Sequence, residues 1–128
     1  MASWTVEAHG SVTATPNQSD QNGISSYAVP IDQSFVLQDI KAGSAYVLTG
    51  DAPRTVSIDP CLNATFVVLK VVGGYVRATL SPTSEQPFSV RVDPYLYVRC
   101  DSDPITAITI QRPPATEVTV HVFIGQRS

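Results

Sequence analysis

The chain has 128 residues, of which 43% are hydrophobic and 15% are charged, and its formal net charge is -3 at pH 7. This balance predicts one folded domain and excludes disorder throughout the chain. Only two of the eight basic residues are lysines, so we expect neither nucleic acid nor an anionic membrane as a partner. The start of the chain lacks a basic segment followed by an apolar one, and no run of about 18 apolar residues predicts a membrane span. We therefore expect a protein made in the cytoplasm without a signal peptide.

The residue types favour strands over helices. Valine, isoleucine and threonine dominate, whereas leucine, lysine and glutamate, which are common in surface helices, are scarce. Ten prolines and seven glycines stand between short apolar runs, as expected of the turns in an all-β domain. No segment has a helical period of useful length.

Residues 4–14 alternate between apolar and polar side chains and predict one long, half-buried strand. Gly10 in its middle could mark a bulge. Residues 15–26 are polar and contain Asn22-Gly23, so we expect a flexible loop. Residues 1–23 could therefore form an extended arm that packs on its own domain or reaches a neighbouring subunit.

Further strands are expected over residues 24–29, 34–40, 45–49, 54–58, 65–72, 75–80, 88–92, 95–100, 105–110 and 117–124. Residues 65–72 are apolar on both faces apart from Lys70, so we place this strand centrally, covered by a sheet or by a partner chain. Gly73-Gly74 predicts a two-residue hairpin turn into residues 75–80. In the last strand, Val118, Val120, Val122 and Ile124 should face the core.

About ten or eleven short strands without helices predict an all-β fold, an antiparallel two-sheet sandwich of jelly-roll type. We expect a single domain over residues 1–128.

The sequence contains few groups that could carry catalysis. His9 and His121 have no nucleophile motif to pair with, and they would bind a metal together only if the first and last strands paired. Asp101 and Asp103 resemble part of a calcium loop but lack further oxygen ligands, so we interpret Asp103-Pro104 as a turn. We predict no catalytic residue, no metal ligand and no cofactor.

Cys61 and Cys100 have no CxxC spacing, so the sequence predicts neither redox chemistry nor a structural zinc site. Cys100 shares a strand face with Leu96 and Val98. We expect a buried free thiol, with a disulfide to Cys61 as the alternative.

One predicted strand face is rich in tyrosine and arginine. Placing Val76, Ala78, Leu80, Phe88, Val90, Val92, Leu96 and Val98 in the core leaves these side chains outward: Tyr75, Arg77, Ser89, Arg91, Tyr95, Tyr97 and Arg99. Tyrosine and arginine concentrate binding energy at interfaces. The face is therefore either a surface for a protein or glycan partner, or cross-strand packing exposed to solvent.

The C-terminal third carries a resemblance. Ile105-Thr106-Ala107-Ile108-Thr109-Ile110, a proline turn, and the segment from Glu117 to Gly125 resemble the closing hairpin of small virion structural proteins of tailed bacteriophages. Those proteins include capsid decoration (cement) proteins and fibre domains. The resemblance implies an all-β, often trimeric protein without catalytic activity, located in the virion after synthesis in the host cytoplasm.

Our first functional hypothesis is thus a non-enzymatic capsid decoration protein, a homo-oligomer with a trimer favoured, that contacts the major capsid protein or another virion protein. The alternative is a glycan- or receptor-binding β-sandwich in which Trp4 and the outward tyrosines stack on sugars. An enzyme would require His9 and His121 to converge in a pocket.

Overall fold

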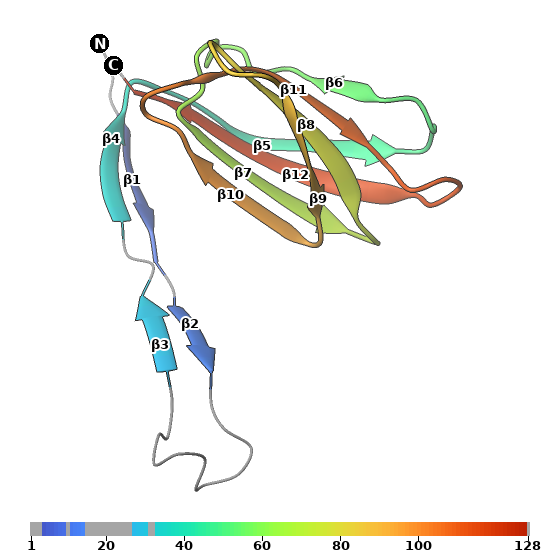
Figure 1. The fold of residues 1–128 in the computed structure, drawn as a ribbon, viewed down its shortest axis with the longest axis horizontal. Coiled ribbons are helices and arrows are strands. Elements are labelled where there is room, and N and C mark those ends of the chain that lie inside the picture. The colour runs from blue at the N-terminus through green and yellow to red at the C-terminus, as the bar shows by residue number, and fades with distance from the viewer. Residues whose placement is uncertain (1–3, 10, 15–26, 31–32, 128) are drawn as a thin grey trace, which may run out of the picture. The chain divides into compact units, whose positions relative to one another are not determined.

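The computed structural model describes residues 4–9, 11–14, 27–30 and 33–127 (Figure 1). The chain divides into two compact units, one containing residues 5–36 and the other containing residues 37–128 together with the first four residues. Throughout the described residues the regular structure is β-strand. The prediction of an all-β protein is therefore confirmed.

The unit formed by residues 5–36 contains two short two-stranded sheets, apart from the end residues Trp4 and Leu37, which belong to the larger unit. In one, β1 (Trp4–Ala8) pairs with β4 (Gln33–Leu37); in the other, β2 (Ser11–Ala14) pairs antiparallel with β3 (Tyr27–Pro30). The single strand expected over residues 4–14 is thus two strands, because His9 lies outside either ladder. The bulge expected at Gly10 and the loop expected over residues 15–26 lie outside the described residues.

The larger unit has two antiparallel sheets of four strands each (Figure 1). Their strands are β5 (Asp39–Leu48), β6 (Arg54–Val56), β7 (Phe66–Val72), β8 (Val76–Pro82), β9 (Phe88–Val92), β10 (Tyr95–Arg99), β11 (Ile105–Gln111) and β12 (Val118–Gln126). One sheet has the order β10-β7-β12-β5 and the other has the order β6-β11-β8-β9. The central position predicted for residues 65–72 is confirmed, since β7 has a neighbour on each side.

Two predicted hairpins are wrong. Gly73 and Gly74 do turn the chain, both with positive φ, but β7 and β8 belong to different sheets. The strands β11 and β12, which we expected to form a closing hairpin, are also in different sheets. A tight turn signal in the sequence marks where a strand ends, but it leaves open whether the next strand pairs with it or crosses the core.

The core contains side chains of both sheets. One cluster of buried hydrophobic residues includes members of β5, β6, β7, β8, β9, β11 and β12, and Leu96 and Val98 of β10 pack against it. Val118, Val120, Val122 and Ile124 are buried as predicted. Phe88, which the alternation placed in the core, remains 41% exposed because it lies at the first position of β9, opposite Leu80 at the end of the ladder.

A bulge explains why β5 is longer than predicted. Separate strands are expected over residues 34–40 and 45–49, but β5 runs from Asp39 to Leu48 and continues through Ala42 and Gly43. They face only Phe123 of β12, since Val122 pairs with Ser44 and Ile124 pairs with Lys41. Gly43 has φ +77°, a value that suits glycine at such a bulge.

Gly125 marks a close approach between β12 and Leu37. Gly125 is buried, Leu37 is fully buried, and a Cβ atom at position 125 would overlap the Leu37 side chain. Next to this contact, the amide of Gln38 donates to the carbonyl of Gln126 at 2.8 Å. The absence of a side chain at position 125 therefore lets Leu37 complete the packing at this point.

We predict that Gly125→Ala lowers the free energy of unfolding by about 1–3 kcal/mol, because the added methyl group must displace Leu37 in a packed site. Urea denaturation followed by fluorescence measures the change. Gly50→Ala is the matched control, since nothing lies within 4 Å of its added Cβ, and it should stay within roughly 0.5 kcal/mol of the parent protein. Equal stabilities for the two variants would contradict the packing role of Gly125.

Candidate functional site

The tyrosine and arginine side chains predicted to share one face lie on two sheets. Tyr75 directly precedes β8, Arg77 is on β8, and Ser89 and Arg91 are on β9, whereas Tyr95, Tyr97 and Arg99 are on β10 of the other sheet. The single surface proposed from the sequence is therefore wrong. Alternation within each strand was correct, but it contained no information on which strands are neighbours. Trp4, at the start of β1, is 48% exposed.

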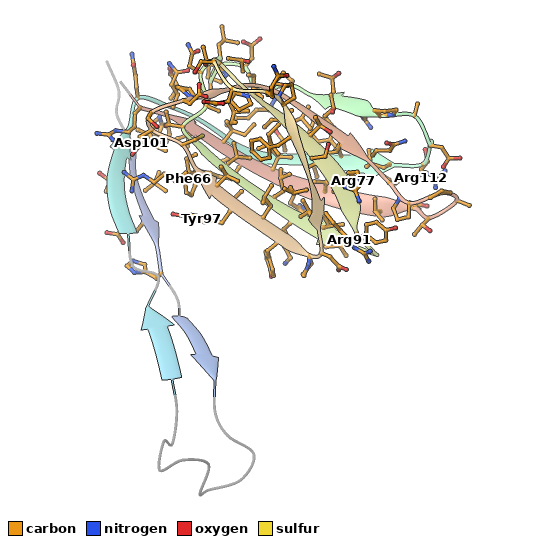
Figure 2. The ribbon with its side chains drawn as sticks, in the orientation of Figure 1. Phe66, Arg77, Arg91, Tyr97, Asp101 and Arg112 are labelled. Carbon is orange, nitrogen blue, oxygen red and sulfur yellow. The ribbon has the colours of Figure 1, made fainter. Side chains whose placement is uncertain are left out.

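The first candidate site is a pocket of about 300 Å³ that we call the arginine pocket. Its charged and hydrogen-bonding side chains are Asp51, Tyr75, Arg77, Arg91, Gln111 and Arg112, and Pro113 and Pro114 complete its wall. Figure 2 shows Arg77, Arg91 and Arg112 gathered toward one end of the two sheets, with Phe66, Tyr97 and Asp101 toward the other. Half of the six arginines of an acidic protein thus line one pocket.

Asp51 and Arg112 hold the rim of the pocket together. An Arg112 nitrogen lies 2.9 Å from a carboxylate oxygen of Asp51, and Arg112 Nε donates to the carbonyl of Gly50 at 2.8 Å. The same Asp51 oxygen accepts the amide of Ala115 at 3.3 Å, and Gln111 Nε2 donates to the Asp51 carbonyl at 3.0 Å. These bonds join the loop after β5 to the loop after β11.

The centre of the pocket is a row of polar side chains across three strands. Arg77 on β8 is directly opposite Arg91 on β9 and directly opposite Gln111 on β11, so the three side chains leave the sheet on one face. The Arg91 guanidinium lies 3.7 Å from the centre of the Tyr75 ring, the geometry of a cation–π contact. This contact fixes Arg91 beside Arg77.

The second candidate site is the outward side of the sheet β10-β7-β12-β5, which we call the aromatic face. Its side chains form rows across the strands: Val47, Thr119 and Val72; then Ala45, His121, Lys70 and Tyr95; then Phe123, Val68 and Tyr97. Tyr95 is 65% exposed, Val72 is 50% exposed and Tyr97 is 40% exposed. The solvent side of an antiparallel sheet is normally polar, so these exposed apolar and aromatic side chains make the face a candidate contact surface.

Three aromatic rings form one end of the aromatic face. Phe66 meets Tyr97 edge-on at 5.1 Å between ring centres, and it meets Phe123 edge-on at 5.6 Å. Burial raises the pKa of the Tyr97 hydroxyl, and the Arg99 guanidinium counteracts part of this rise. Edge-to-face pairs hold aromatic rings rigid. Phe66 is only 3% exposed, so its role is to hold the more exposed Tyr97 ring in place.

Sequence reasoning missed several residues of both sites. Asp51, Gln111 and Arg112 had no recognisable signal, because they are contributed by segments distant in the chain. Val68 and Val72 did have one, since the strand over residues 65–72 is apolar on both faces. That pattern predicts a strand covered on each side by a sheet or by a partner chain, and such a partner would lie on the aromatic face.

The two histidines considered for metal binding belong to different units of the chain and have different neighbours. His9 follows the last residue of β1, and its Nε2 lies 3.1 Å from a carboxylate oxygen of Glu7 on that strand. His121 is on β12, opposite Lys70. The first and last strands do not pair, because β1 pairs with β4 and β12 pairs with β5 and β7. Among the described residues, no three histidine, cysteine, aspartate or glutamate side chains are grouped as a metal site requires.

The acidic pair at residues 101 and 103 serves the fold. Asp101 forms ion pairs with Arg99 at 3.2 Å and with Arg127 at 3.1 Å. Asp103 accepts the amide of Ser84 at 3.0 Å, and the neighbouring Pro104 carbonyl accepts the hydroxyl of Thr83 at 2.8 Å. Asp103-Pro104 thus lies in a bend between β10 and β11, as the sequence predicted.

Both cysteines are free. The thiol of Cys61 is buried against the carbonyl of Ile124 at 3.7 Å, and the thiol of Cys100 donates to the carbonyl of Ala64 at 3.4 Å. Burial raises the pKa of Cys61 to about 11, with a smaller contribution from Asp39. Burial also raises the pKa of Cys100. Thiols that keep their protons are poor nucleophiles.

Comparison with protein-family models, with curated proteins and with solved structures gave no match. Within the part of the chain that the structure describes, no helix has the length and apolar character needed to cross a membrane.

The raised pKa of Cys61 predicts a pH dependence of stability. Above pH 9 the thiol of the unfolded chain loses its proton, while the folded protein retains it up to about pH 11. The free energy of unfolding should therefore fall between pH 9 and pH 11, by roughly 2 kcal/mol from this group.

Denaturant titrations of the parent protein and of Cys61→Ala over this pH range measure the contribution. Other groups that titrate there are common to both proteins, so the two stabilities should converge as the pH rises. A constant difference between pH 8 and pH 11 would contradict the predicted pKa.

Proposed function

We propose that the two sheets form a jelly-roll sandwich. The antiparallel pairs β5 with β12, β6 with β11, β7 with β10, and β8 with β9 support this topology. They are the pairs obtained when one long hairpin is wound around a core, and successive pairs alternate between the sheets. The shared hydrophobic cluster supports the packing of the sheets face to face.

We propose further that the protein is a non-enzymatic structural subunit that assembles with copies of itself through the aromatic face. The observation that carries this proposal is the exposure of Tyr95, Tyr97 and Val72 on a sheet whose opposite side already packs on the core. Rigid tyrosines flanked by aliphatic side chains are typical of the centre of a protein interface. A second copy would cover these three exposed side chains.

The two-stranded sheets of residues 5–36 support the same proposal. Within the described residues, β1 pairs with β4 and β2 pairs with β3, so each pair keeps unpaired backbone groups along its outer edges. Two-stranded ribbons are marginally stable in water, and open strand edges pair readily with other chains. We infer that this unit adds to a neighbouring subunit in the assembly.

The kind of assembly is proposed from the sequence resemblance of the C-terminal third to virion structural proteins of tailed bacteriophages, a resemblance of sequence alone, since β11 and β12 do not form the hairpin expected from it. We propose a capsid decoration protein, trimeric as that resemblance implies, located in the virion in contact with the major capsid protein. Jelly rolls occur in viral capsid domains and also in lectins. The fold is therefore compatible with this role but does not by itself select it.

The self-association is tested by light scattering of the purified protein over a range of concentrations. We predict a trimer, and we predict that the double variant Val72→Ser, Tyr95→Ala weakens it by at least roughly tenfold, because hot-spot truncations cost more than about 1 kcal/mol each.

Phe88→Ala and Leu62→Ala are matched controls, since both residues are exposed and apolar but lie outside the aromatic face. Neither control substitution should change the mass of the oligomer in solution. A parent protein that is monomeric at every concentration, or controls that dissociate it equally, would reject the aromatic face as the interface.

A separate prediction concerns the N-terminal unit. A chain lacking residues 1–36 should associate more weakly than the full chain if that unit pairs with a neighbour, because strand addition contributes backbone hydrogen bonds across the interface. Light scattering of both chains at equal concentration measures the difference. An unchanged mass would remove this unit from the assembly mechanism while leaving the aromatic face in place.

A further inference from the structure

We propose that the arginine pocket is a binding site for an acidic sugar residue, with Arg77 and Arg91 as the carboxylate-binding pair. The site is separate from the self-association proposed above, because none of its residues belongs to the aromatic face.

The arginine pocket has a positive charge that is not balanced by its neighbours. Arg77 and Arg91 are directly opposite each other on β8 and β9, a placement that is unfavourable for like charges. No hydrogen bond or ion pair is formed by Arg77 within the described residues. An anion between the two guanidinium groups would turn this repulsion into two favourable contacts.

The acidic residues nearby do not neutralise this pair. Asp51 is already engaged by Arg112 at 2.9 Å and by the amide of Ala115 at 3.3 Å. Asp93 reaches Arg91 at 3.4 Å, but both side chains are more than half exposed, so this contact contributes little. The positive charge of Arg77 and Arg91 is therefore available to a ligand.

The shape of the guanidinium groups favours a carboxylate as the ligand. A guanidinium group presents a planar fork that matches the two oxygens of a carboxylate. Arg91 is held by the Tyr75 ring at 3.7 Å, and it is therefore positioned before a ligand arrives. Preorganised donors lose less conformational entropy on binding.

Gln111 favours a sugar over a simple anion. Gln111 lies in the same row as the two arginines and donates through Nε2 to the Asp51 carbonyl. This bond fixes the amide, whose oxygen Oε1 has no partner among the described residues. A fixed acceptor beside two cationic donors suits a ligand that carries hydroxyl groups as well as a carboxylate.

The size and walls of the pocket agree with this ligand. A volume of about 300 Å³ accommodates a single monosaccharide unit and lies at the lower end of the usual range for ligand sites. Pro113 and Pro114 provide an apolar wall against which the carbon-bound hydrogens of a sugar ring can pack. The glycan hypothesis from the sequence has tyrosines stacking on the sugar. In the pocket, arginines would bind the sugar, and the Tyr75 ring holds Arg91.

The test is an NMR chemical-shift titration of the full chain with D-glucuronate, read on the side-chain Nε–Hε signals of the arginines. D-glucose is the neutral comparison, because it has the same ring without the carboxylate. We expect glucuronate to shift the signals of Arg77 and Arg91 in a saturable manner, and glucose to bind at least roughly tenfold more weakly.

Arg77→Gln should weaken glucuronate binding by roughly tenfold, whereas Arg127→Gln, an exposed arginine outside the pocket, should leave it unchanged. Arg127→Gln loses only an exposed ion pair with Asp101, which contributes little to stability. Both variants should therefore stay within a few degrees of the parent's melting temperature and keep its oligomeric mass, so a loss of binding is distinguishable from a failure of folding or of self-association.

Three results would overturn the proposal. Absence of saturable binding of glucuronate would reject the site, and equal binding by Arg77→Gln would remove the arginine pair from it. Equally tight binding of inorganic phosphate or of N-acetylglutamate would show a general anion site or a site for acidic protein side chains, and would reject the assignment to a sugar.

Discussion

The constraint on which the structure depends is that each of the two sheets must bury one face, and buried side chains of both sheets meet in one hydrophobic cluster. Successive strands of the larger unit therefore alternate between the sheets, except for β8 and β9, which remain in one sheet. The hydrophobic cluster that results contains buried side chains from seven of the eight strands. Because the connections cross the core, the loops gather at the two ends of the sheets.

This winding produces the arginine pocket. The segment after β5, the β8–β9 pair and the segment after β11 are separated by tens of residues in the sequence, yet they meet at one end of the sheets. Bonds of Gln111 and Arg112 to residues 50 and 51 join the two loops there. Arg77 and Arg91 line the pocket from β8 and β9, and strands packed on a core are where a precise binding site is best placed.

The aromatic face has a different origin. In the sheet β10-β7-β12-β5, the inward residues are aliphatic because they pack on the other sheet, and the outward residues would be expected to be polar. Phe66, Tyr97 and Phe123 instead form edge-to-face contacts on the outward side. A charged residue, Lys70, lies in the middle of the same face, 5.9 Å from the centre of the Tyr95 ring. A face that combines rigid rings with a few polar groups favours a specific partner over non-specific hydrophobic association.

The sequence alone determined the strands. Period-two alternation and turn residues located β7 to β12 to within a few residues, and the last strand's Val118, Val120, Val122 and Ile124 were correctly placed in the core, because alternation depends only on the local geometry of an extended chain. Tertiary structure decided everything that depends on neighbours. Gly73-Gly74 predicted a turn, but only the packing of the two sheets placed β8 across the core from β7. The same packing separated Tyr95 and Tyr97 from Arg77 and Arg91, and it brought Arg112 and Gln111 to the latter pair. Strand pairing is set by non-local burial, and a single sequence contains no local signal for it.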